Sequence, residues 1–159
     1  FARGETAHFG SCGAKDDTRA ADAYGKAIAV GFSDKVWQAE AYHKLGLALE
    51  RSGKLEPAKQ AILKALAIRP NTAEFLNSLG SVYAKLGDHE QAVATFERAV
   101  VLRPNYTVAR SNLAEAYEQV NVKRAIAEYE TYLALVEGIE EEQSRVAKAQ
   151  ARVQYLKKR

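Results

Sequence analysis

LGSVYAKLGDHEQAVATFERAVVLRPN, residues 79–105, repeats the outline of LGLALERSGKLEPAKQAILKALAIRPN, residues 45–71. The two stretches share an opening Leu-Gly, a second glycine in the middle, two spaced alanines and a closing Arg-Pro-Asn. Equivalent residues lie 34 positions apart throughout, for example Pro70 and Pro104. A fixed period of this length predicts that copies of one supersecondary unit stack on each other.

Each copy has the pattern of two helices joined by a tight turn. In the second copy the first helix carries an apolar stripe at helical spacing, formed by Leu76, Leu79, Val82, Tyr83 and Leu86. Gly87 ends this helix, because the left-handed conformation is least costly without a Cβ. Asp88 then offers an N-cap oxygen, and Gln91 is placed to complete a capping box. The stripe of the second helix follows at Ala92, Val93, Phe96, Ala99, Val100 and Leu102.

The smallest residues of the unit have a packing role. Gly80 and Ala92 have little or no side chain, so the backbones of the two helices can approach closely there. Phe96 is large and fills the space toward the next unit. Because neither helix can bury its stripe alone, neighbouring hairpins must stack.

This pattern resembles the tetratricopeptide repeat family, whose signature runs aromatic or Leu, Leu-Gly, aromatic, Ala, aromatic, Ala and Pro. In the first clear repeat the matching residues are Tyr42, Leu45, Gly46, Leu49, Ala58, Ile62, Ala65 and Pro70. In the second they are Leu76, Leu79, Gly80, Tyr83, Ala92, Phe96, Ala99 and Pro104. The resemblance implies an all-α fold, a right-handed α-solenoid of antiparallel helix hairpins.

A third repeat departs from the signature in its turn and in its second helix. It keeps Leu113, Ala114, Tyr117, Ala125 and Tyr129, but its turn is one residue shorter. Asn121 stands where Gly is usual, and Asn tolerates the left-handed region best among the other residues. Tyr132 replaces the second small alanine, and the closing proline is missing, which leaves the packing beyond this repeat open. Arg110 replaces the aromatic or Leu; we expect its stem to pack and its head to reach solvent, the alternative being a ligand carboxylate.

The two ends of the chain are expected to be atypical units. Residues 20–30 predict the second helix of an earlier repeat, whose first helix would be glycine-rich and frayed, and Ser33 or Asp34 caps the next helix. Residues 140–158 predict one amphipathic helix that begins with three glutamates, either a solvating cap or a helix that docks a partner or a further repeat. We therefore expect one domain over residues 1–159, with a degenerate repeat at 1–33, repeats at 34–71, 72–105 and 106–137, and a capping helix at 138–159.

The composition and motifs argue against a catalytic, metal or nucleic-acid site. The formal net charge of +3 is small and scattered along the chain. His8, His43 and His89 lie on separate units without Cys or carboxylate at ligand spacing, and Cys12 is interpreted as a structural thiol rather than a nucleophile. We expect no enzyme activity, no cofactor, no metal and no nucleic-acid partner. No apolar run is long enough to span a membrane.

The start of the sequence leaves the compartment undetermined. The chain contains no methionine and begins at Phe1, so it is a processed or truncated form or one piece of a longer protein. Targeting signals can therefore have been lost, and the localisation is unknown, with a soluble cytoplasmic protein as the default expectation.

The resemblance implies that the first helix of each hairpin lines a concave groove that holds a peptide or a partner's helix. Side chains on those helices that lie off the packing stripe are the candidates. From helical spacing they are Glu40, His43, Leu47, Glu50 and Arg51 in the first repeat, Glu74, Asn77, Ser81 and Lys85 in the second, and Val108, Ser111, Asn112, Glu115, Glu118 and Gln119 in the third.

The charges of this candidate groove predict a preference for a neutral or basic segment. Its five glutamates and two cations, Arg51 and Lys85, give a net charge of −3, although ordinary solvated helix charge is an alternative interpretation. Some members of the family bind acidic chaperone tails through Lys, Arg and Asn. The matching places here hold His43, Leu47, Ser78, Val108 and Asn112, of which Asn112 alone has a suitable side chain, so an acidic chaperone tail is disfavoured.

These features predict a non-catalytic adaptor that binds a protein partner in the groove. One alternative is a structural subunit or assembly factor that is held in a larger complex by its edges and terminal helix. Another is a regulatory domain of a longer enzyme, as in glycosyltransferases with such arrays. Asn77 and Asn112 resemble the asparagine ladder of that group only faintly, and the two are not in register with each other. RNA binding is the weakest alternative, because basic faces with aromatic platforms are not assembled.

Overall fold

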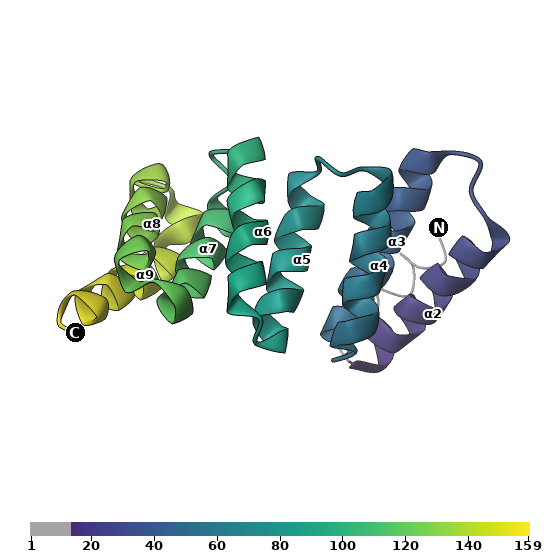
Figure 1. Ribbon diagram of the computed structural model, residues 1–159, viewed down its shortest axis with the longest axis horizontal. Coiled ribbons are helices and arrows are strands. Elements are labelled where there is room, and N and C mark those ends of the chain that lie inside the picture. Colours follow the sequence, from purple (N-terminus) through teal and green to yellow (C-terminus); the bar gives the residue numbers. More distant parts are fainter. Residues whose placement is uncertain (1–13) are drawn as a thin grey trace.

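The computed structural model describes residues 14–159, and within them every regular element is helical. Along this described part of the chain, eight α-helices and one short 3-10 helix follow each other (Figure 1). Their bounds are α2 (Ala14–Val30), α3 (Lys35–Arg51), α4 (Leu55–Ile68), α5 (Ala73–Leu86), α6 (His89–Leu102), α7 (Thr107–Val120), α8 (Val122–Leu135), η1 (Glu140–Glu142) and α9 (Gln143–Lys157).

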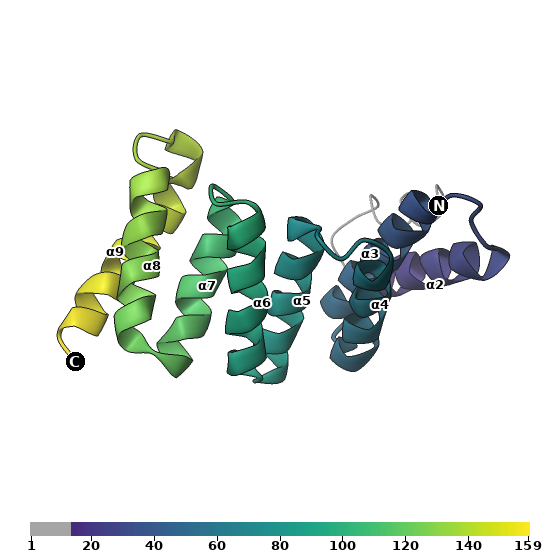
Figure 2. The ribbon, with the colours of Figure 1, turned by 45° about the horizontal axis from the view of Figure 1, so that its top comes forward.

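The helices stand side by side in one row, so the molecule is an all-α solenoid. Helices α3 and α4, α5 and α6, and α7 and α8 form antiparallel hairpins, and each hairpin packs against the next (Figures 1 and 2). Helices α2 and α9 lie at opposite ends of the row. The ranges 34–71, 72–105 and 106–137 each contain one of these hairpins.

The turn between α5 and α6 has the predicted glycine conformation but a different hydrogen-bond pattern. Gly87 is left-handed, with φ of 83°, and the Asp88 carboxylate accepts from the backbone N–H of Gln91 at 3.3 Å. The predicted capping box is wrong in its second half, since the backbone N–H of Asp88 donates to the carbonyl of Tyr83 at 3.0 Å. The donor that Gln91 would satisfy is thus already used to close the end of α5.

Close contact between the helices of a hairpin depends on missing side chains, as the sequence predicted. A Cβ added to Gly80 would lie 2.6 Å from the ring of Phe96, which is buried. A Cβ on Gly46 would collide in the same way with Ile62 of α4. The repeated glycine therefore sets the distance between the two helices, and the large residue facing it fills the gap.

The third hairpin solves its shortened turn without a left-handed residue. Asn121 has an extended backbone, with φ of −155°, so the expectation that it takes the conformation of glycine is wrong. It serves as the end of α7 and as the N-cap of α8, and its side-chain oxygen accepts from the backbone N–H of Arg124 at 3.2 Å. Asn121 is thus both C-cap and N-cap, whereas in the turn between α5 and α6 these roles belong to Gly87 and Asp88.

The terminal helices differ in length from the prediction. Helix α2 begins at Ala14, earlier than the expected residue 20, and the frayed helix expected before it lies outside the described residues. Asp34 caps α3 by accepting from the backbone N–H of Val36 at 2.7 Å. The C-terminal helix begins at Gln143 rather than residue 140, because the three glutamates form the separate turn η1.

Tyr132 links the third repeat to the C-terminal end of the chain. Its size had left the packing beyond this repeat open. The side chain is fully buried, and its hydroxyl donates to the carboxylate of Glu142 at 2.8 Å. Burial and the neighbouring carboxylate raise the pKa of Tyr132 to about 12. Ala149, Val153 and Leu156 of α9 are buried in the same core, so the solenoid continues into α9.

Candidate functional site

Seven of the predicted groove residues come together in two adjoining pockets. The α5–α7 pocket is lined by Ser81, Ala84, Lys85, His89, Phe96, Asn112, Glu115, Ala116 and Gln119. The α7–α9 pocket is lined by Val108, Ser111, Asn112, Glu115, Tyr129, Arg145, Lys148 and Ala149. Asn112 and Glu115 belong to both pockets, so the two form a continuous surface across α5, α7 and α9.

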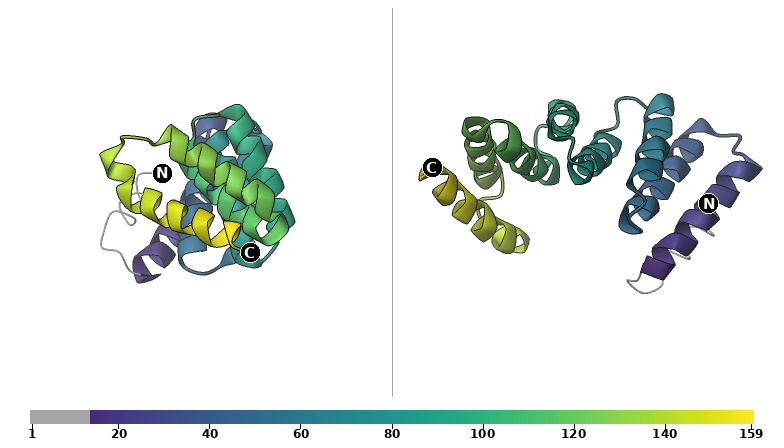
Figure 3. Two further views of the ribbon diagram at one scale, coloured as in Figure 1. Left: turned by 90° about the vertical axis from the view of Figure 1, so that its left-hand side faces the viewer. Right: turned by 60° about the horizontal axis from the view of Figure 1, so that its bottom comes forward.

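Helix α9 contributes to this surface, although the predicted groove contained none of its residues. Its residues Arg145, Lys148 and Ala149 face α7 across the second pocket. In Figure 3 α9 lies beside α7 and α8 at the end of the row, where the first helix of another repeat would stand. The repeat period could have predicted the position of α9, because a helix that follows a complete third repeat packs where the first helix of a fourth repeat would lie.

Asn77 and Asn112, which are out of register with each other in the repeat, make contact through their side chains. The side-chain amide of Asn112 donates to the side-chain oxygen of Asn77 at 3.0 Å. Their separation is 35 residues, one more than the repeat. An offset of one does not prevent contact between neighbouring first helices, since His43 and Ser78 make contact at the same separation. The predicted offset between Asn77 and Asn112 is therefore present, but it does not keep their side chains apart.

His43 does not line an open groove, so its assignment to the groove is wrong. Its side chain is only 8% exposed, and its ring lies 4.5 Å from that of Phe75. Ser78 donates its hydroxyl hydrogen to the carbonyl of Glu74, so its oxygen accepts from Nε2–H of His43 at 2.8 Å. Burial first, and then the charge of Lys44, lower the pKa of His43 to about 4, against an opposing effect of Glu74. The neutral ring joins α3 to α5.

The five glutamates of the predicted groove are all paired with cations of the chain itself. The pairs are Glu40 with Arg69 at 2.8 Å, Glu50 with Lys85 at 2.9 Å, Glu74 with Arg103, Glu115 with Lys148 at 3.1 Å, and Glu118 with Arg152. The sequence count of −3 omitted four of these cations, because Arg69 and Arg103 lie just after second helices and Lys148 and Arg152 lie on α9. The surface is therefore not the unpaired acidic strip that the count suggested.

Two of these ion pairs recur at equivalent positions of the repeat. Glu40 and Glu74 are equivalent positions, and so are Arg69 and Arg103, which open the two Arg-Pro-Asn motifs. Each arginine also stacks over an aromatic ring of the following unit, Arg69 over Phe75 at 5.6 Å and Arg103 over Tyr106 at 4.6 Å. The motif thus joins three consecutive helices, a role that the period alone could have revealed.

The remaining predicted residues lie outside the two pockets. Leu47 is half-buried and Arg51 is exposed, and neither lines the α5–α7 or the α7–α9 pocket. Glu118 is engaged beneath the surface, where Tyr129 donates to it at 2.6 Å and Arg152 donates through two nitrogens. Burial opposes its ionisation, but the hydrogen bonds from Arg152 and Tyr129 prevail and lower the pKa of Glu118.

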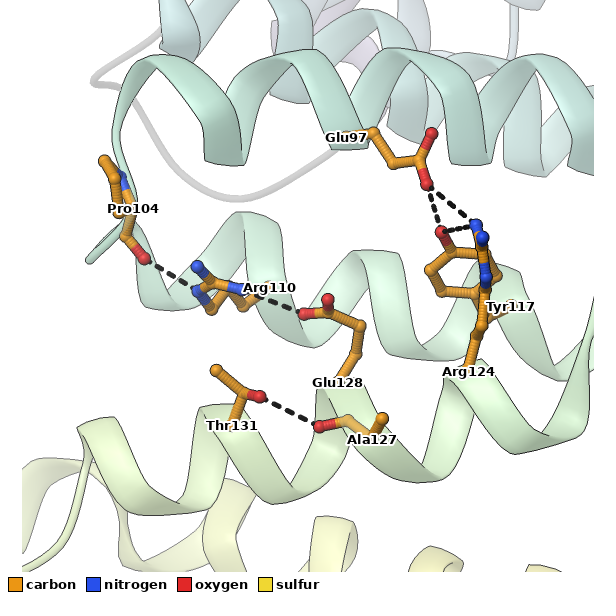
Figure 4. A network of polar contacts seen from close by, with 8 residues as sticks. All are labelled: Glu97, Pro104, Arg110, Tyr117, Arg124, Ala127, Glu128 and Thr131. Atoms are coloured by element: carbon orange, nitrogen blue, oxygen red, sulfur yellow. Dashed lines mark hydrogen bonds and ion pairs between the residues drawn. The ribbon is translucent and has the colours of Figure 1, made fainter.

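Arg110 is held by its own chain rather than by solvent or a ligand (Figure 4). Its Nε donates to the carbonyl of Pro104 at 2.7 Å, and another nitrogen donates to Glu128 at 3.0 Å. Its side chain is 17% exposed, so the expectation of a head in open solvent is wrong. At the other end of α7, Figure 4 shows Tyr117 between Glu97 and Arg124, which ties α6, α7 and α8 together.

Over residues 14–159 no group of three or more His, Cys, Asp or Glu side chains is arranged to hold a metal ion. Cys12 and His8 lie outside the described residues. No helix in the described part of the chain is long and apolar enough to cross a membrane.

Comparison with known proteins identifies the repeat. Residues 43–107 match the family model described as tetratricopeptide repeat. No curated protein matches the sequence.

Three solved structures illustrate the likeness of the fold. MamA has 21% sequence identity and a TM-score of 0.72, covering 91% of this chain and 88% of its own. The tetratricopeptide domain of Arabidopsis OM64 has 17% identity and a TM-score of 0.70, covering 79% and 98%. The second such domain of human RPAP3, solved in complex with the HSP70 peptide SGPTIEEVD, has 21% identity and a TM-score of 0.69, covering 79% and 100%.

The repeated helix hairpins, the glycines that set their spacing, the family match and the neighbouring structures agree with each other. Residues 43–107 match the tetratricopeptide repeat model, and the described chain has the fold of solved tetratricopeptide repeat domains.

Proposed function

We propose that this chain is a non-catalytic adaptor that binds a segment of a partner protein across the surface formed by α5, α7 and α9. Tetratricopeptide repeats generally serve as interaction modules, and the RPAP3 domain of the same fold was solved with a peptide. The observation that carries the proposal is the continuity of the two pockets through Asn112 and Glu115. A peptide lying there would meet polar side chains from three helices.

The internal pairing of the glutamates changes the expected recognition. Glu50 is bound by both Lys85 and the hydroxyl of Ser81, and Glu118 by both Arg152 and Tyr129. A basic partner would have to displace these contacts to gain its own. We therefore propose that shape and hydrogen bonding, rather than positive charge, select the partner over the α5–α7 part of the surface. The places compared with the chaperone clamp include the buried His43 and Ser78, which supports the exclusion of an acidic tail held in that manner.

Site-specific photo-crosslinking tests where a partner binds. A photoreactive amino acid is placed at Ser111 in the α7–α9 pocket, or at the exposed position Ala94 on α6. We expect a partner to crosslink from position 111 and not from position 94, and we expect the added substitution Asn112→Arg to abolish it. The substitution Ala94→Arg is the matched control and should leave the crosslink unchanged.

The same experiment addresses the alternative of a structural subunit. Ile139, between α8 and η1, is 42% exposed and lines a separate hollow with Leu133, Val146 and neighbouring residues. A partner that crosslinks from position 139, and not from position 111, would contradict binding in the groove and support attachment through the end of the solenoid.

A further inference from the structure

We propose that the corner where α8 passes into α9 is a second docking surface, which binds a short amphipathic helix of a partner protein that carries lysine or arginine beside its apolar side chains. The hollow at this corner lies between Leu133 and Val136 on one side and Ile139 and Val146 on the other, and we name it the corner hollow. The inference goes beyond the proposed function, because the corner hollow shares no lining residue with the two groove pockets.

The corner hollow arises from the long connection between α8 and α9. This connection covers residues 136–142, whereas residues 69–72 and 103–106 join the earlier hairpins. Gly138 turns the chain in the left-handed conformation, with φ of 77°, and η1 follows before α9 begins. Figure 2 shows this connection at the outer end of the row. The hollow has a volume of about 620 Å³, against about 330 Å³ for the α5–α7 pocket and about 150 Å³ for the α7–α9 pocket.

The corner hollow has an apolar floor that is open to solvent at one side. Val136 is buried, Leu133 and Val146 pack partly buried against the main core, and Ile139 is 42% exposed. An apolar centre within a polar rim is the usual anatomy of a protein interface. Helices α8 and α9 both border the hollow, and a helix docks into such a groove through apolar side chains one turn apart.

The charges at the rim specify a basic partner. The described residues that line the hollow include the carboxylates of Glu137 and Glu140 and no Lys, Arg or His, and the exposed Glu141 lies next to them. Within residues 14–159 none of these three carboxylates forms an ion pair, whereas Glu142 pairs with Arg145. They differ in this from the groove glutamates, which are all paired. A cation of a partner can therefore reach them without displacing a cation of this chain.

Titration of the full chain with capped peptides, followed by NMR of its backbone amides, tests the corner hollow. The probe is acetyl-Lys-Leu-Ala-Ala-Lys-Leu-Ala-Ala-Lys-amide, in which the leucines and the lysines each recur after one helical turn. One counterpart has glutamates in place of the lysines, and another has serines in place of the leucines. We expect the probe alone to shift the amides of Ile139, Val146 and Gln150, and the effect should weaken as NaCl rises from about 50 to about 300 mM. No shift, or an equal shift with either counterpart, would overturn the proposal.

Variants with matched charge separate recognition from general electrostatic attraction. The double substitution Glu137→Gln with Glu140→Gln should weaken binding of the probe by about tenfold or more. The control is Asp22→Asn with Glu90→Gln, which removes the same number of charges at exposed positions outside the hollow. Ile139→Ser should weaken binding by about fivefold, because an apolar contact is lost. All variants should retain the helical circular dichroism of the parent. Unchanged binding in the first double variant, or equal weakening in its control, would refute the role of the carboxylates.

The same signals distinguish a partner helix from a second copy of the chain. Shifts at Ile139 and Val146 that depend on protein concentration, without any peptide, would show that a second copy fills the hollow and would overturn the proposal. The test is also independent of the proposed function, because crosslinking from position 111 concerns the groove alone. Loss of that crosslink leaves the corner hollow standing, and an inert corner hollow leaves the groove standing.

Discussion

At the scale of single residues, the glycines that face large side chains make a sharp test of the packing. We expect Gly80→Ala to destabilise the protein by about 1–2 kcal/mol, because the strain of pushing the buried Phe96 ring aside exceeds the gain in helix propensity. Gly25→Ala is the matched control in α2, where an added Cβ meets no atom of the described chain within 4 Å. It should stabilise by about 0.5–1 kcal/mol. Urea unfolding measures both, and equal stabilisation by the two changes would contradict the packing argument.

The contribution of His43 to stability should depend on pH. Its folded pKa of about 4 lies below the ordinary value of 6.5, so between these values the unfolded chain binds a proton that the folded chain excludes. The stabilisation is therefore complete above pH 6.5 and falls as the pH approaches 4, by up to about 3 kcal/mol. Thermal or urea unfolding across this range measures it.

The substitution His43→Gln should flatten this part of the stability curve, because it removes the buried ring that excludes the proton in the folded chain. A curve of the same steepness in His43→Gln and the parent would show that other groups cause the dependence.

At single positions, the sequence predicted the role of residues that recur with the repeat. It did not predict the role of side chains that could face either a ligand or a neighbouring helix. Gly46 and Gly80 could be predicted because a missing Cβ has one use between two close helices. His43 could not, since a histidine on a first helix can face a ligand or a neighbouring helix, and Phe75 and Ser78 decide the matter from a different repeat. The partners of the groove glutamates were missed for the same reason.

At the scale of elements, α9 should depend on Arg152 more than on its other cations. Replacing Arg152 by Gln leaves the mostly buried Glu118 with Tyr129 as its remaining partner, and we expect a loss of about 1 kcal/mol. Lys157→Gln breaks an exposed pair on the same helix and should change stability by less than about 0.5 kcal/mol. Hydrogen exchange of the α9 amides measures the difference. Equal exchange rates in the two variants would show that apolar packing alone attaches α9.

The boundaries of elements were predicted less well than their existence. The short turn before α8 was recognised, yet one residue, Asn121, caps two helices there with an extended backbone. The negative charges of the glutamates at 140–142 favour the start of a helix. However, Glu142 accepts a hydrogen bond from Tyr132, and α9 begins at the next residue, Gln143. Both corrections come from tertiary contacts that a local pattern does not contain.

At the scale of the whole molecule, the buried apolar side chains of residues 14–159 form two separate clusters. The main core runs from Ala39 in α3 to Leu156 in α9, and a small separate cluster joins α2 to α3 through Ala20, Ala21, Tyr24 and Ala48. Leu49 is partly buried and packs against both clusters. In a linear array each unit is stabilised by its immediate neighbours, so a small end cluster should open more easily than the centre.

Substituting Tyr24 by Ala should therefore release α2 while the rest of the molecule stays folded. Tyr24 is 1% exposed and is the largest side chain of the small cluster. Loss of a buried aromatic side chain costs about 3–5 kcal/mol. We expect this cost to exceed the stability of the contact between α2 and α3, because the cluster between them has four buried residues. Native-state hydrogen exchange should show α2 unprotected and α5 to α8 unchanged. The comparison is Phe96→Ala, which lies in the main core and should raise exchange across α5 to α8 together. Uniform loss of protection along the whole chain in Tyr24→Ala would mean that the two clusters unfold as one unit.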